Sequence, residues 1–178
     1  ARPGVISMTK RISISTLDAM KASGDKFVMI TAYDATFARL ASEAGAETIL
    51  VGDSLGMVLQ GHETTIPVSL DAMAYHTECV ARARPHSLIV ADLPFMSFSN
   101  SEDTLHASTR LMQAGAQMVK LEGGTWLSDS IHRLVERGVP VCAHLGLTPQ
   151  SVNVFGGYRV QGRTPKEAKS NGMNGPGI

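Results

Sequence analysis

Short apolar runs that end in a charged or histidine side chain recur four times along this chain, and no other feature limits its fold as strongly. The runs are TILVGD, SLIVAD, MVKLE and VPVCAH, which end at Asp53, Asp92, Glu122 and His144. A carboxylate at the edge of an apolar interior needs a partner, water or a cation, because carboxylates are rarely buried alone. The pattern therefore predicts buried strands that each present a polar group at the C-terminal end.

The segments between these runs have the apolar spacing of helices. They cover residues 34–44, 69–84, 101–114 and 125–137. Three of them begin with residues that commonly cap helices, namely Asp34, Ser69 and Ser101. Glycines stand just past three helix ends, at Gly45, Gly115 and Gly138. A further helix is expected at residues 15–22 and a first strand at residues 27–31, so strands and helices alternate.

This alternation predicts βα units and a parallel sheet that is buried on both faces. Two architectures accommodate five such strands, an open doubly wound sheet and part of an eight-stranded barrel. In both, ligands bind at the C-terminal ends of the strands. The turn after the first strand, AYDATF, has no glycine-rich nucleotide signature, and the spread of polar groups over several strand ends is typical of a barrel. A complete barrel needs about 250 residues, more than this chain has.

Composition narrows the functional class. The chain has 178 residues, of which 43% are hydrophobic, and its 16 basic and 16 acidic residues are dispersed. This balance argues against a nucleic-acid-binding surface. The apolar runs are too short to span a bilayer, and no signal-like segment opens the sequence, so we expect a cytoplasmic protein without membrane contact.

Three of the polar strand ends have the chemistry of a metal site. Asp53, Asp92 and Glu122 offer hard oxygen ligands of the kind that Mg²⁺ prefers, with positions left for a substrate. Each acid taken alone has a simpler explanation, as a helix cap or as the partner of a surface arginine. Their equivalent positions on three strands favour the metal site.

Lys120 and His144 add groups that act on anions. Lys120 and Glu122 are two residues apart, so on one strand they face the same side. A lysine directed into an acidic pocket can stabilise an anion that develops during a reaction. His144 can donate to a carboxylate or move a proton, although a structural role is equally consistent with its position. The five remaining histidines are interpreted as structural or solvated: His62, His76, His86, His106 and His132.

Several longer motifs resemble those of a known family. They are VGDSLGMVLQGHETT, ADLPFMS, KLEGG, HLGLTPQS and FGGYRVQGR, in this order. Together they resemble the ketopantoate hydroxymethyltransferases, over about residues 16–163. The resemblance implies a (β/α)8 TIM barrel of the phosphoenolpyruvate/pyruvate superfamily, an α/β fold, of which this chain carries about the first five βα units. It also implies a large homo-oligomer.

The activity implied by the resemblance is transfer of a hydroxymethyl group from 5,10-methylenetetrahydrofolate to α-ketoisovalerate, in pantothenate synthesis. Asp53, Asp92 and Glu122 match the family's Mg²⁺-binding acids. Ser54 and Lys120 match groups that hold the keto acid, as Asp53 and Asp92 do through the metal, and His144 matches a pocket histidine. Lys120 and His144 are the expected catalytic residues. The family's general base is a glutamate on a later strand, and no match to its motif is found in this chain.

Two other functions stay open at this level. One is a carbon–carbon lyase of the phosphoenolpyruvate mutase and isocitrate lyase type, which shares the metal acids but not HLGLTPQS or GGYRVQGR. The other is a non-catalytic partial barrel that persists by packing in an oligomer. The expected organisation is an amino-terminal arm and helix (residues 1–24), a partial barrel domain (25–163) and a tail without family resemblance (164–178).

Overall fold

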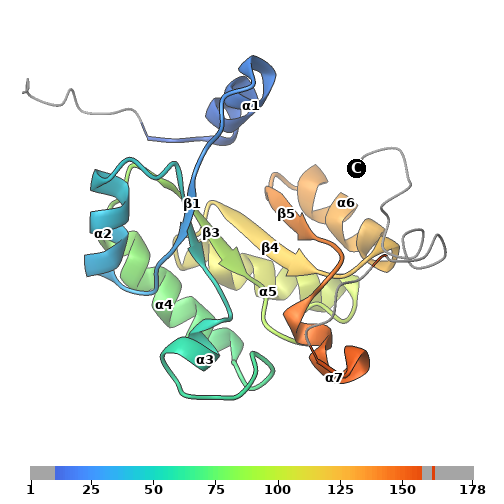
Figure 1. Cartoon of the computed structure of the whole chain (residues 1–178). Helices are drawn as coiled ribbons and strands as arrows, with labels where there is room; N and C mark the ends of the chain where they lie inside the picture. The colour runs from blue at the N-terminus through green and yellow to red at the C-terminus, as the bar shows by residue number, and fades with distance from the viewer. Residues whose placement is uncertain (1–10, 158–161, 163–178) are drawn as a thin grey trace, which may run out of the picture.

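The computed structural model describes residues 11–157 and 162, and its centre is one sheet of five parallel strands (Figure 1). The strands pair in chain order, each with the next. They are β1 (Met29–Thr31), β2 (Thr48–Val51), β3 (Leu88–Asp92), β4 (Met118–Glu122) and β5 (Val141–His144). All four strand pairs are parallel. This order is that of successive βα units in a (β/α)8 barrel, so the fold is a partial barrel.

The helices connect the strands. The α-helices are α1 (Ile14–Ser23), α2 (Ala35–Glu43), α3 (Leu55–Val58), α4 (Leu70–Arg82), α5 (Ser101–Gln113), α6 (Ser128–Glu136) and α7 (Val152–Phe155). Two 3-10 turns, η1 (Thr125–Leu127) and η2 (Pro149–Ser151), precede α6 and α7. Helices α2, α4, α5 and α6 contact the strands and one another in chain order, so they form one layer against the sheet. Helix α1 buries none of its residues and stands apart from the sheet in Figure 1.

The helix boundaries follow the expected capping chemistry with one correction. The Asp34 carboxylate accepts hydrogen bonds from the backbone of Thr36 and Phe37, and Ser69 caps α4. The cap of α5 is Asn100, however, and not Ser101, because the Asn100 side chain accepts the hydrogen bond from the backbone N–H of Asp103. The glycines past the ends of α2, α5 and α6 have φ values of 95°, 112° and 80°, a region that favours glycine.

The core lies between the sheet and this helix layer. Strand β3 is buried along its whole length, as expected for a central parallel strand. Its neighbours contribute Ile49, Val51, Val119 and Leu121, all at most 1% exposed. The edge strand β1, by contrast, is exposed at each residue. The buried centre of the sheet therefore fixes the position of the three middle strand ends.

The register brings the polar strand ends to one edge of the sheet. Asp92 lies opposite Lys120, and Glu122 lies opposite His144. Val51 lies opposite Ala91, so Asp53 follows β2 at the same level. The short helix α3, which directly follows Ser54, is not anticipated by the sequence pattern. The expected tail, residues 164–178, lies outside the described residues.

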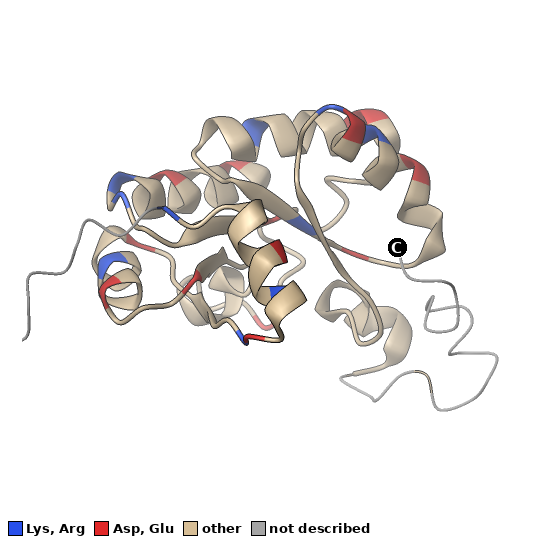
Figure 2. Ribbon diagram, turned by 90° about the horizontal axis from the view of Figure 1, so that it is seen from above, with Lys and Arg blue, Asp and Glu red and all other residues tan. Residues whose placement is uncertain are grey.

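Figure 2 shows Lys and Arg interleaved with Asp and Glu along the described helices. Within residues 11–157 and 162, no helix combines the length and the apolar character needed to cross a membrane.

Candidate active site

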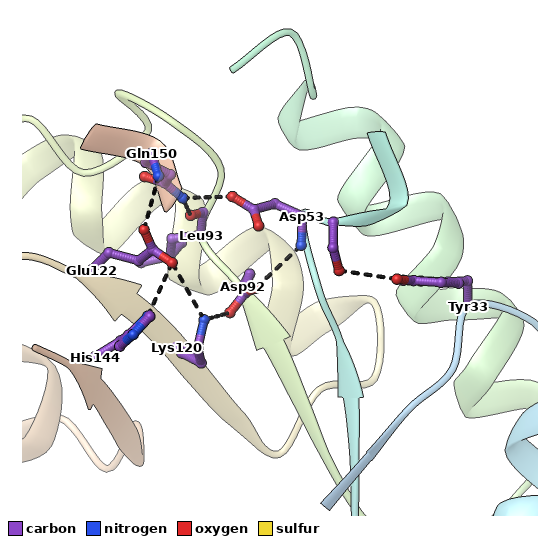
Figure 3. Close-up of polar contacts among 9 residues, drawn as sticks. Tyr33, Asp53, Asp92, Leu93, Lys120, Glu122, His144 and Gln150 are labelled. Atoms are coloured by element: carbon purple, nitrogen blue, oxygen red, sulfur yellow. Dashed lines mark hydrogen bonds and ion pairs between the residues drawn. The ribbon is translucent and has the colours of Figure 1, made fainter. Parts of the chain in front are cut away.

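Asp92 is the centre of a buried polar cluster at the C-terminal edge of the sheet (Figure 3). Its Oδ1 accepts a 2.6 Å hydrogen bond from the Lys120 ammonium, and its Oδ2 accepts a 3.1 Å bond from the backbone N–H of Asp53. Asp92 is only 4% exposed. Both carboxylate oxygens are thus engaged by groups from the two neighbouring strands.

Glu122 joins this cluster from the end of β4. Its Oε1 lies 3.8 Å from the Lys120 ammonium and 3.1 Å from Nδ1 of His144. Its Oε2 accepts a 3.1 Å hydrogen bond from the backbone N–H of Gln150. Lys120 and Glu122 therefore share one side of β4, as their spacing predicts, and Lys120 also reaches across to Asp92.

Gln150 connects the cluster to the segment after β5. Its side-chain Nε2 donates to Oδ2 of Asp53 at 2.7 Å and to the carbonyl of Leu93 at 3.0 Å. Sequence reasoning missed this residue, which stands 97 positions from Asp53. Two local signals are its place in the motif HLGLTPQS and the preceding Pro149, a residue suited to the first position of a helical turn.

Ser54 lies at the edge of the cluster and pairs with Tyr33. The Ser54 and Tyr33 hydroxyls share a 2.9 Å hydrogen bond, and Nδ1 of His76 lies 2.9 Å from the Tyr33 carbonyl. Tyr33 was also missed as a site residue, although it follows β1 just as the acids follow their strands. The contact of His76 with the backbone agrees with the structural role expected for it.

Burial and the charges of neighbouring side chains shift the pKa values of the cluster. Desolvation by burial, helped by the Asp92 carboxylate, raises the pKa of Asp53 from 3.8 to about 6. Burial also disfavours the charged form of Lys120, but Asp92, Glu122 and Asp53 outweigh it and raise the pKa of the ammonium. Lys120 is therefore charged near neutral pH, and one cation faces three acids.

The donor set fits a hard divalent cation. Three carboxylates against one ammonium leave an excess of negative charge, and carboxylate oxygens are the preferred ligands of Mg²⁺. Among the described residues, no group of three or more His, Cys, Asp or Glu side chains is arranged to surround an ion. The Lys120 ammonium instead lies within reach of both Asp92 and Glu122. The chemistry of the acids thus fits Mg²⁺, while the lysine occupies part of the space between them.

A pocket of about 110 Å³ opens beside Glu122 and Gln150. Its wall is largely apolar and includes Phe98 and Trp126, whose rings stack with centroids 6.2 Å apart. The pocket therefore offers an apolar surface next to two polar groups of the cluster. This combination suits a small ligand with a charged end and an apolar end.

The raised pKa of Asp53 predicts how stability depends on pH. The folded state binds this proton more tightly than the unfolded chain, so the free energy of unfolding falls as pH rises from about 4 to about 6 and then levels off. The shift from 3.8 to about 6 corresponds to at most about 3 kcal/mol. Denaturant titrations from pH 4 to pH 8 will show a smaller loss in Asp53→Asn than in the wild type, and the remainder comes from Asp92, whose pKa burial also raises. Asp71→Asn, an exposed control on α4, will keep the full loss, and an unchanged profile in Asp53→Asn would contradict the assignment.

The fold and the cluster define a class, that of (β/α)8-barrel proteins with an acidic cluster at the strand ends. Sequence comparison then gives the family. A model of the ketopantoate hydroxymethyltransferase family matches residues 11–172, and the chain belongs to that family.

Curated relatives agree with this assignment. Proteins named 3-methyl-2-oxobutanoate hydroxymethyltransferase from Marinobacter nauticus and Burkholderia vietnamiensis are 59% and 61% identical over 89% and 86% of the chain. A protein from Pseudomonas aeruginosa, named 3-methyl-2-oxobutanoate hydroxymethyltransferase 2, is 60% identical over 89%. The chain spans 56–60% of the length of these relatives.

Solved structures with a similar fold are more distant. Phosphonopyruvate hydrolase superposes with a TM-score of 0.64 at 18% identity, over 91% of this chain and 68% of that one. A 2,3-dimethylmalate lyase of the phosphoenolpyruvate mutase and isocitrate lyase superfamily gives 0.55 at 14% identity, over 72% and 51%. These similarities show the fold alone, which is a partial barrel.

Proposed function

We propose that this chain contributes to transfer of a hydroxymethyl group from 5,10-methylenetetrahydrofolate to α-ketoisovalerate, with ketopantoate as product. The observation that carries the proposal is the buried cluster of Asp53, Asp92, Lys120 and Glu122 at the strand ends. It occurs in a chain about 60% identical to relatives with that name.

The residues of the cluster have different roles in binding the keto acid. Asp53, Asp92 and Glu122 would hold Mg²⁺, which when bound polarises the ketone and so acidifies the adjacent carbon. Lys120 stabilises the negative charge that develops on the ketone oxygen when the proton of this carbon passes to a general base, which the family resemblance places on a later strand. Ser54, oriented by its hydrogen bond to Tyr33, binds the substrate from the β2 side.

His144 faces the same site from β5. Its Nδ1 contacts Glu122, and about a third of its side chain is exposed. When both ring nitrogens carry a proton, Nδ1 donates to Glu122 and Nε2 can donate to the substrate. The folate co-substrate, a homo-oligomeric assembly and a cytoplasmic location belong to the same proposal and rest on the family resemblance and on composition.

The competing lyase function has little support. The lyase-type structures share less than 25% of their sequence with this chain, whereas the hydroxymethyltransferases share about 60%. The similarity of this chain to mutases and lyases therefore concerns the fold alone. The third alternative, a non-catalytic partial barrel, predicts a folded chain that does not bind the keto acid.

Ligand-dependent stabilisation tests the proposed function. A ligand that binds only the folded state at 100 times its Kd stabilises that state by about 2.7 kcal/mol. For a chain of this size, we expect α-ketoisovalerate to raise the midpoint of thermal unfolding by roughly 5–10 °C when Mg²⁺ is present. Differential scanning calorimetry with and without Mg²⁺ measures the shift. Isovalerate, which lacks the ketone, is the control, and equal shifts with both acids or without Mg²⁺ would refute the proposal.

A further inference from the structure

We propose that Gln150 is a positioning residue, which orients the Asp53 carboxylate and ties it to Glu122 so that the three acids bind Mg²⁺ tightly. The inference rests on the proposed function, because it assumes that these acids hold the metal. It adds a residue from the segment after β5, whereas the three acids lie at the ends of β2, β3 and β4.

The side-chain amide of Gln150 makes two hydrogen bonds to buried groups. Both acceptors of its Nε2 are buried groups from other elements: Oδ2 of Asp53 at 2.7 Å and the Leu93 carbonyl at 3.0 Å. The residue is only 6% exposed, so water competes weakly for these bonds. Because Nε2 of Gln150 holds one oxygen of the Asp53 carboxylate, rotation of this carboxylate about the Cβ–Cγ bond is restricted.

The neighbours of the Gln150 amide determine which way it points. Rotating it by half a turn would place Oε1 against the Asp53 carboxylate and the Leu93 carbonyl, both of which are acceptors. Two acceptors in contact repel, so only the observed orientation is stable. Among the described residues, Oε1 of Gln150 has no hydrogen-bond partner.

Gln150 links two acids, Asp53 and Glu122, whose strands do not pair with each other. Strand β3 separates β2, which precedes Asp53, from β4, which carries Glu122. The Gln150 backbone N–H donates to Oε2 of Glu122, while its side chain holds Asp53. The turn that presents Gln150 is itself braced, since Thr148 donates from its hydroxyl to the Ser151 hydroxyl at 2.9 Å. One rigid turn therefore sets the spacing of the outer two acids.

The expected effect on metal binding follows from this geometry. Groups that hydrogen-bond to metal ligands commonly change affinity by about 10- to 100-fold when they are removed. In Gln150→Met the side chain keeps its length and loses both donors, so we expect the Kd for Mg²⁺ to rise by about 10- to 100-fold. In Gln150→Asn the side chain keeps its amide but is one methylene shorter, so the amide does not reach Asp53. We expect the Kd for Mg²⁺ to rise by a similar factor.

Isothermal titration calorimetry with Mg²⁺ alone, on the 178-residue chain, tests the inference. Gln113→Met is the matched control, since Gln113 is exposed on α5, and its Kd will equal that of the wild type. Circular dichroism and the thermal midpoint without Mg²⁺ report folding. A residue with a merely structural role would lower that midpoint and leave the Mg²⁺ affinity of the folded variant unchanged.

The outcomes separate the two proposals. Wild-type affinity in either folded Gln150 variant, or failure of both variants to fold, overturns the positioning role while the proposed function stands. If the wild-type chain itself binds no Mg²⁺, the metal site fails, and the inference about Gln150 fails with it. Weaker Mg²⁺ binding in both folded variants, with an unchanged control, supports the positioning role.

Discussion

The Lys120→Met variant will bind Mg²⁺ more tightly than the wild type and α-ketoisovalerate more weakly. The Lys120 ammonium lies 2.6 Å from Asp92 and 3.8 Å from Glu122, so it competes with a metal ion for both carboxylates. Methionine keeps most of the volume of the stem and removes the charge. The keto acid loses a charged hydrogen-bond donor, which is worth about 1.5–3 kcal/mol, or roughly 10- to 100-fold in Kd.

Titration of each ligand by calorimetry measures both effects. Mg²⁺ is titrated alone, and the keto acid is titrated with Mg²⁺ at saturation, so that the tighter metal binding does not obscure the weaker substrate binding. Lys21→Met, on the exposed side of α1, is the matched control and will change neither Kd. Unchanged keto-acid affinity in Lys120→Met would show that this lysine is structural.

The Asp92→Asn variant will lose Mg²⁺-dependent binding of α-ketoisovalerate while its fold is retained. A hard divalent cation prefers a charged oxygen, and asparagine offers one neutral oxygen in its place. Either orientation of the amide also turns an NH₂ group toward a donor, because Asp92 accepts from both Lys120 and the backbone of Asp53. We expect the Kd for Mg²⁺ to rise by about 100-fold or more, beyond the range for indirect partners of a metal.

Calorimetry with Mg²⁺ and then with the keto acid checks this result, and circular dichroism checks the fold. Asp18→Asn, which changes an exposed aspartate on α1, is the control and will behave as the wild type. Mg²⁺ and keto-acid affinities that stay within about threefold of the wild type in Asp92→Asn would remove Asp92 from the metal site.

The positions of the polar residues at the strand ends are largely predictable from the sequence pattern. The pattern alone predicts that Asp53, Asp92 and Glu122 lie together, because parallel strands in chain order bring equivalent positions to one edge. The same reasoning places Lys120 and Glu122 on one side of β4, which their ion pair confirms. The alternation of strands and helices is likewise predictable, since it depends on local periodicity and on caps.

Other contacts depend on how distant segments pack. The spacing in the sequence places Lys120 and Glu122 on the same side of one strand, yet the shorter contact of the Lys120 ammonium is to Asp92 across the strand pair. The cap of α5 is Asn100 because its side chain reaches the backbone N–H of Asp103, a choice between neighbours that spacing alone does not make.

The sequence by itself determined the class of fold, the strands that carry the site and the chemical nature of the acids, because each of these depends on residue type and short-range spacing. The tertiary structure alone decided the partners. Tyr33 pairs with Ser54, which is 21 positions away. Gln150 donates a hydrogen bond to Asp53, which is 97 positions away. No local periodicity encodes such pairs, since they exist only after the sheet has aligned the strand ends and the turn after β5 has packed over them.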